Sequence, residues 1–126
     1  MAVIRKLTLR INQETQIDSP DIGFNFKFLS VVEDSRCPEG VDCIWEGNAR
    51  LQLQMSLTKT NNNLEIFELN TNLEPQSIRI EDYEIKILDL IPKPKVDLKI
   101  ERENYMATFT VTNLKIVTDQ SDFIEN

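Results

Sequence analysis

Apolar and polar residues alternate with a period of two along most of the chain, which is typical of half-buried β-strands. The alternation is clear in seven segments, residues 7–11, 24–28, 49–57, 64–69, 78–80, 83–87 and 105–111. In the clearest of them, every second residue from Ala49 to Leu57 is apolar and the residues between are polar. No stretch of ten or more residues has the 3.6-residue period of an amphipathic helix, so the pattern predicts an all-β protein.

Two shifts in phase predict irregular strands. The apolar row at 24–28 does not continue in step, and a bulge or bend near Leu29–Ser30 would explain this, because one extra residue exchanges the two faces of a strand. A second shift occurs at Leu88 and Leu90.

The connecting segments are rich in residues that form turns. The polar run 59–63 (KTNNN) predicts a turn that joins the strands on either side in a hairpin. Residues 91–95 contain two prolines, which have no N–H to donate, so a central strand is excluded there. The alternation of Val96, Leu98 and Ile100 predicts a short edge segment.

A chain of 126 residues has the size of one domain. With seven to nine short strands and turns at regular spacing, we expect a single antiparallel β-sandwich, immunoglobulin-like or related, with a small β-barrel as the alternative. Residues 1–117 would form this domain, and residues 118–126 an acidic, frayed C-terminal tail.

Composition narrows the possible functions. The net charge of −7 argues against nucleic-acid partners, because affinity for phosphates depends mainly on Lys and Arg. The chain has no histidine, which removes the Ser-His-Asp and Cys-His nucleophiles and the commonest metal ligand. No apolar run approaches the roughly 18 residues of a transmembrane helix. We therefore expect no enzyme, no cofactor and no transmembrane segment.

Residues 34–47 (DSRCPEGVDCIWEG) differ most from the rest of the chain, since they hold both cysteines and the only tryptophan. Five residues separate Cys37 from Cys43, and Pro38 and Gly40 favour a compact turn between them. We predict a disulfide that shapes this loop and stabilises the fold by only about 2 to 2.5 kcal/mol. Two sulfurs are too few for a zinc site, and the spacing is not C-x-x-C; free thiols in a cytosolic protein remain the alternative.

The other side chains of this loop allow two interpretations each. A tryptophan beside a disulfide is usually part of the core, which is the expectation for Trp45; the alternative is an exposed ring that stacks on a sugar or a partner side chain. The acidic residues could offer oxygen ligands to calcium, but their spacing fits no EF-hand. We expect a solvated acidic loop without a metal site, in which Arg36 pairs with Asp34 or a neighbour. The acidic residues in question are Glu33, Asp34, Glu39, Asp42 and Glu46.

The stretch VVEDSRCPEGVDCIWEGNARLQL (31–53) resembles an uncharacterised family of small bacterial secreted proteins and lipoproteins with the motif D-S-R-C-P-x(4)-C-I/V-W-x-G-x-A. The similarity extends from about Leu7 to Leu114. The positions that match the motif are Asp34, Ser35, Arg36, Cys37, Pro38, Cys43, Trp45, Gly47 and Ala49. The resemblance implies an extracytoplasmic β-domain with a local disulfide and brings no known activity.

The first residues, MAVIRKLTLR, lack the apolar region of a signal peptide. We expect an extracytoplasmic protein (periplasmic, cell-surface or secreted) whose signal peptide is absent from this chain, with a cytoplasmic location as the alternative.

These expectations favour a non-catalytic extracytoplasmic binding or interaction module. Its partner would be a protein, a glycan or another cell-envelope ligand, bound by the loop that the disulfide closes. The alternatives are an inhibitor of a hydrolase such as a protease, and a small enzyme with paired carboxylates. The candidate contact residues are Asp34, Arg36, Pro38, Gly40, Trp45 and Gly47.

Overall fold

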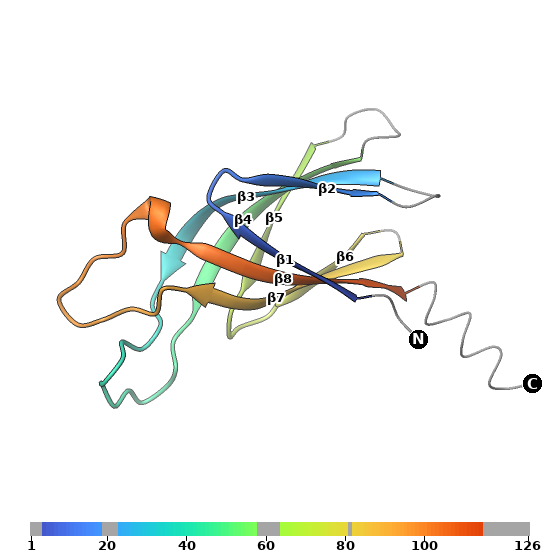
Figure 1. Ribbon diagram of the computed structural model, residues 1–126. Coiled ribbons are helices and arrows are strands. Elements are labelled where there is room, and N and C mark those ends of the chain that lie inside the picture. Colours follow the sequence, from blue (N-terminus) through green and yellow to red (C-terminus); the bar gives the residue numbers. More distant parts are fainter. Residues whose placement is uncertain (1–3, 19–22, 58–63, 81, 115–126) are drawn as a thin grey trace, which may run out of the picture.

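The computed structural model describes residues 4–18, 23–57, 64–80 and 82–114, which form two four-stranded antiparallel sheets packed face to face (Figure 1). One sheet has the order β1-β8-β7-β6 and the other β2-β3-β4-β5. Neither sheet closes into a barrel, so the predicted all-β sandwich is confirmed and the barrel alternative is wrong. The strands are β1 (Ile4–Arg10), β2 (Glu14–Asp18), β3 (Gly23–Asp34), β4 (Ala49–Leu57), β5 (Leu64–Asn70), β6 (Ser77–Ile80), β7 (Tyr83–Ile91) and β8 (Met106–Asn113).

The core lies between the two sheets and consists of the inward rows that the alternation predicts. Phe24, Phe26 and Phe28 of β3 are fully buried. Phe26 and Phe28 lie against Phe109 of β8, whereas Phe24 lies against Tyr83 of β7. The rings of Phe26 and Phe109 meet edge to face with centroids 5.0 Å apart. Each such ring stabilises the fold by about 1.5–3 kcal/mol through burial, so these aromatic residues make a large contribution to the packing of the two layers.

Both predicted shifts in phase are bulges. The pairing of β3 with β4 shifts between Phe28 and Ser30, and that of β7 with β8 shifts between Ile87 and Asp89. The second bulge adds one residue, Leu88, whose side chain is exposed. The added residue brings Ile87 and Leu90 onto the same inward face, where both are buried. The bulge therefore places an apolar side chain on the outside of β7.

The predicted hairpin of residues 49–57 and 64–69 is confirmed by the antiparallel pairing of β4 with β5. The edge segment predicted at 96–100 is wrong: residues 95–98 form a turn, in which the Leu98 N–H donates to the Lys95 carbonyl and Asp97 has φ 64°. The short strand β2 was not predicted, because its residues show little alternation. The turn predicted at 59–63 and the tail predicted at 118–126 lie outside the described residues.

Candidate functional site

Residues 34–47, which differ most from the rest of the sequence, lead from the end of β3 towards β4 and project from one end of the sandwich (Figure 1). Cys37 and Cys43 form a disulfide with their Cα atoms 6.0 Å apart, which confirms the predicted bond. No free cysteine occurs, so the free-thiol alternative does not describe this structure. A disulfide is typical of proteins in oxidising, extracytoplasmic compartments.

Backbone hydrogen bonds continue the β3–β4 pairing into the base of the loop. The Ser35 N–H donates to the Asn48 carbonyl, and the Cys37 N–H donates to the Glu46 carbonyl, each at 2.7 Å. Gly47 lies between these pairs with φ +79°. A Cβ atom there would overlap the Ser35 carbonyl oxygen and lie 2.7 Å from the Cα of Arg36, so only glycine allows this close approach.

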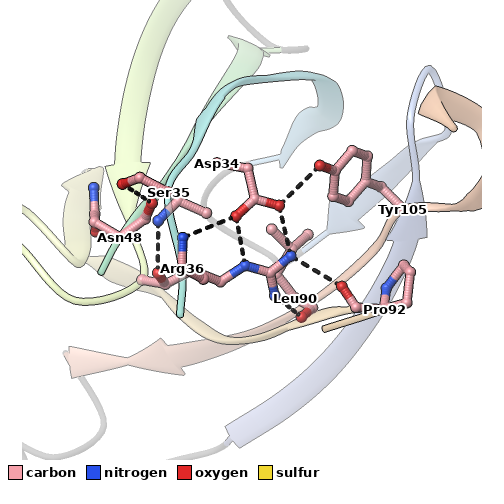
Figure 2. A network of polar contacts seen from close by, with 9 residues as sticks. Asp34, Ser35, Arg36, Asn48, Leu90, Pro92 and Tyr105 are labelled. Carbon is pink, nitrogen blue, oxygen red and sulfur yellow. Dashed lines mark hydrogen bonds and ion pairs between the residues drawn. The ribbon is translucent and has the colours of Figure 1, made fainter. Parts of the chain in front are cut away.

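Asp34 and Arg36 form a clamp between the two sheets (Figure 2). Nε and Nη2 of Arg36 each donate to the Asp34 carboxylate at 2.8 Å, and both side chains are largely buried. The same guanidinium donates to the carbonyl oxygens of Leu90, at 2.6 Å, and Pro92, at 2.9 Å. The Tyr105 hydroxyl donates to Asp34 Oδ2 at 2.9 Å. The end of β3 is thus tied to the end of β7 and the start of β8, which belong to the other sheet.

The electrostatics of this clamp stabilise the charged form of Asp34. Burial alone would raise the pKa of its carboxyl, but the hydrogen bonds from Arg36 and Tyr105 and the charge of Arg36 outweigh burial and lower that pKa. Burial and the adjacent carboxylate raise the pKa of Tyr105 to about 12. Asp34 therefore acts as an ionised structural acceptor, and Arg36 carries a charge that is already paired.

A second polar cluster holds the turn after β5 against the loop. Asn48 is buried, donates to Asn70 Oδ1 at 2.9 Å and accepts the backbone N–H groups of Asn72 and Leu73 at 2.9 and 3.1 Å. The amide of Asn70 in turn donates to the Pro75 carbonyl at 3.3 Å. This fixes residues 71–73 beside the disulfide-closed loop.

These contacts surround an open groove of about 590 Å³, within the range of small-ligand sites. Its walls come from the disulfide loop, from the turn after β5 and from the end of β7 with the segment that follows. The lining residues are Arg36, Cys37, Val41, Asp42, Cys43, Ile44, Trp45, Glu46, Gly47, Thr71, Asn72, Leu88, Asp89, Leu90, Lys93 and Pro94. A site of this composition can cover an apolar group and hydrogen-bond or pair with polar groups around it.

Trp45 is 52% exposed and lines the groove, so its expected place in the core is wrong and the exposed alternative holds. Ile44 projects fully into solvent, and Val41 is also exposed. Because the loop is closed by a local disulfide and lies outside both sheets, it offers no interior in which a large ring could be buried.

The predicted site residues have different places in this structure. Asp34 is part of the clamp, whereas Arg36 belongs both to the clamp and to the groove wall. Pro38 is half-buried, and Gly40 lies exposed in the loop with φ +80°. Gly47 is buried, and its backbone forms part of the groove wall.

The expected solvated acidic loop is confirmed for Glu33, Glu39, Asp42 and Glu46, which are exposed, but not for Asp34, whose carboxylate is tied into the clamp. Over the described ranges, no group of three or more potential ligand side chains could hold a metal ion. No helix among the described residues has the length and apolarity needed to cross a bilayer.

Two walls of the groove were missed in the sequence. Thr71 and Asn72 come from the turn after β5, and Leu88, Asp89 and Lys93 come from the end of β7 and the residues after it. The only sequence signal was the phase shift at Leu88, which indicates an irregular strand but no ligand. Comparisons of the chain with protein-family models, curated proteins and solved structures find no match.

Proposed function

We propose that the protein is a non-catalytic extracytoplasmic binding module whose contact surface is the disulfide-closed loop and the groove beside it. The observation that carries the proposal is the exposure of Ile44 and Trp45 at the edge of a groove of about 590 Å³. Large apolar side chains gathered at one exposed site are typical of interaction surfaces, and tryptophan is among the residues that contribute most to binding.

The loop is held in place by contacts within the protein itself. The disulfide closes it, the clamp of Arg36 and Asp34 fixes its first residues, and Asn48 fixes the adjoining turn. A surface that is already ordered loses less conformational entropy on binding, which favours affinity.

The geometry supports a binding module more than an inhibitor of proteases. An inhibitory loop must offer an extended backbone to the enzyme. Here the Glu39 N–H donates to the Pro94 carbonyl at 2.9 Å, and the Val41 N–H donates to the Pro38 carbonyl at 3.2 Å. Two backbone N–H groups between the cysteines are therefore already hydrogen-bonded within the protein and are not free to pair with an enzyme.

A carboxylate-based enzyme is also less well supported. A general acid at neutral pH needs a carboxyl whose pKa is raised. At this site the pKa of Asp34 is lowered, and its oxygens are occupied by Arg36 and Tyr105. The partner class is a protein or a cell-envelope glycan, since an indole ring can pack on either.

The fluorescence of Trp45 tests the proposal directly, because it is the only tryptophan. The wild-type protein would be titrated with a panel of soluble oligosaccharides and short peptides. We expect at least one probe to shift the Trp45 emission saturably. Ile44→Ser and Leu88→Ser should weaken that response, since both residues line the groove and both side chains are exposed beside it. Ile66→Ser is the matched control: Ile66 is 60% exposed, more than Leu88 at 48%, but it lies on β5, outside the groove. Equal affinity in all three variants would refute the assignment of the site.

A further inference from the structure

Two neighbouring loops with opposite charge lie at the end of the sandwich that holds the groove. The disulfide-closed loop, residues 37–47, carries three acidic residues and no basic one. The segment after β7, residues 92–100, carries three lysines and a single acidic residue, Asp97. The two loops are in contact, because the Glu39 N–H donates to the Pro94 carbonyl at 2.9 Å, and Figure 1 shows both projecting beyond the strands.

Opposite charges of the two loops lie close together within the molecule, since Glu39 and Lys95 are neighbours in a parallel β-bridge, but none of these charges forms an ion pair among the described residues. Each of the six side chains is exposed, and the ion pairs of the described residues involve none of them. The residues are Glu39, Asp42, Glu46, Lys93, Lys95 and Lys99. Arg36, a cation that lines the groove, is already paired with Asp34.

Both loops also expose large apolar side chains beside their charges. The most exposed are Ile44 and Trp45 on the acidic loop and, on the basic loop, Val96 and Leu98, which are 54% and 65% exposed. Each loop therefore combines apolar residues with a surrounding charge of one sign, which is the arrangement of an interface core and its polar rim.

We propose that a second copy of this chain binds at this surface, with the acidic loop of each copy against the basic loop of the other. A two-fold axis between the copies produces both contacts at once, since an isologous interface uses the same patch on each subunit. The two loops supply the complementary charges that such a pairing requires, and the four apolar side chains are buried between them. This inference rests on the proposed function and names a partner for the same site.

Sedimentation velocity over a series of protein concentrations up to about 1 mM, at about 0.1 M ionic strength, measures the association. We expect a reversible monomer–dimer equilibrium for the wild type. Two charge reversals test the pairing: Glu39→Lys with Asp42→Lys and Glu46→Lys, and Lys93→Glu with Lys95→Glu and Lys99→Glu. Each triple variant alone should remain monomeric, and an equimolar mixture of the two should sediment as a heterodimer.

The reversal of the acidic loop separates pairing from net charge. It makes the chain less negative, so a loss of association cannot come from stronger overall repulsion. The matched control makes the same change in net charge outside both loops, with Glu14→Lys, Glu65→Lys and Asp82→Lys, at three exposed residues. This control should dimerise at least as well as the wild type. Circular dichroism would confirm that all variants are folded.

Three results would overturn the inference: a wild type that stays monomeric at about 1 mM, a dimer that either reversal leaves intact, or a mixture that forms no heterodimer. A monomeric wild type leaves the proposed function untouched, because the Trp45 titration tests that function with other probes. If Ile44→Ser alters neither the dimer nor any Trp45 response, the proposed function fails as well.

Discussion

Replacing Gly47 by alanine tests whether the base of the loop has the close backbone approach that the structure shows. Gly47 and Gly40 have nearly the same φ, +79° and +80°. They differ in the space around them: a Cβ at Gly47 would meet the backbone of Ser35 and Arg36, whereas a Cβ at Gly40 meets nothing within 4 Å. Both substitutions therefore place an alanine in the left-handed backbone region, at the same cost in free energy. They differ only in the steric overlap of the new Cβ atom with neighbouring backbone, which occurs at Gly47 and not at Gly40.

The magnitudes follow from these two contributions. A left-handed backbone costs a non-glycine residue about 1–2 kcal/mol, which is the expected loss for Gly40→Ala. Forcing a methyl group into a filled space costs about 1–3 kcal/mol more, so Gly47→Ala should lose about 2–5 kcal/mol. The reduced entropy of the unfolded chain is common to both variants and cancels in the comparison.

Urea denaturation followed by far-UV circular dichroism measures both variants. With a slope of about 1–3 kcal/mol per molar urea, the excess loss corresponds to a midpoint about 1 M lower for Gly47→Ala than for Gly40→Ala. Equal midpoints for the two variants would refute the reasoning, because they would mean that the backbone of Ser35 is not where the structure places it.

Three further predictions concern the contacts that hold the loop. Asn48→Ala removes the acceptor of two backbone N–H groups and should lower the free energy of unfolding by about 3 kcal/mol in urea denaturation; a loss below about 1 kcal/mol would contradict the network. Because the folded-state pKa of Tyr105 is raised from 10 to about 12, its contribution to stability is complete below pH 10 and is lost between pH 10 and 12. Thermal unfolding from pH 8 to 12 should show this loss in the wild type and a smaller one in Tyr105→Phe; parallel curves would contradict it. Replacing Cys37 and Cys43 by serine should cost about 2 kcal/mol and leave the far-UV spectrum unchanged, since the bond closes only a short loop outside the sheets; global unfolding would contradict this.

Much of the fold could be predicted from the sequence because strand pairing imposes a period of two. The inward rows of β3, β4 and β8 follow directly from the alternation, and the bulge at Phe28–Ser30 follows from its interruption. Short segments were less predictable. β2 has five residues with little alternation, and residues 96–100 alternate although Asp97 turns the chain. At such lengths, turn geometry decides the conformation and the apolar pattern does not.

The candidate site was predictable only where its contacts are local. Cys37 and Cys43 are close in sequence, as are Asp34 and Arg36, and both pairings were anticipated. The bond from Tyr105 to Asp34 spans 71 residues and depends on how the two sheets stack, so no local pattern indicates it.

The groove could not be predicted from local patterns either, because its walls come from three separate segments of the chain. The exposure of Trp45 could not be predicted for a related reason. Whether a ring beside a disulfide is buried depends on whether a sheet covers the loop, and here neither sheet does.

The most direct test of the central claim, that the end of the sandwich around the disulfide loop is the contact surface, is a fragment screen by NMR. Two-dimensional ¹H–¹⁵N spectra of the labelled protein, recorded with mixtures of small fragments, locate the surface that binds ligands most readily. We predict that the shifted resonances come from residues 41–47, 71–72, 88–90 and 93, together with the single indole N–H of Trp45. Fragments that bind mainly elsewhere, such as over β5 and its exposed Leu64 and Ile66, would contradict the claim.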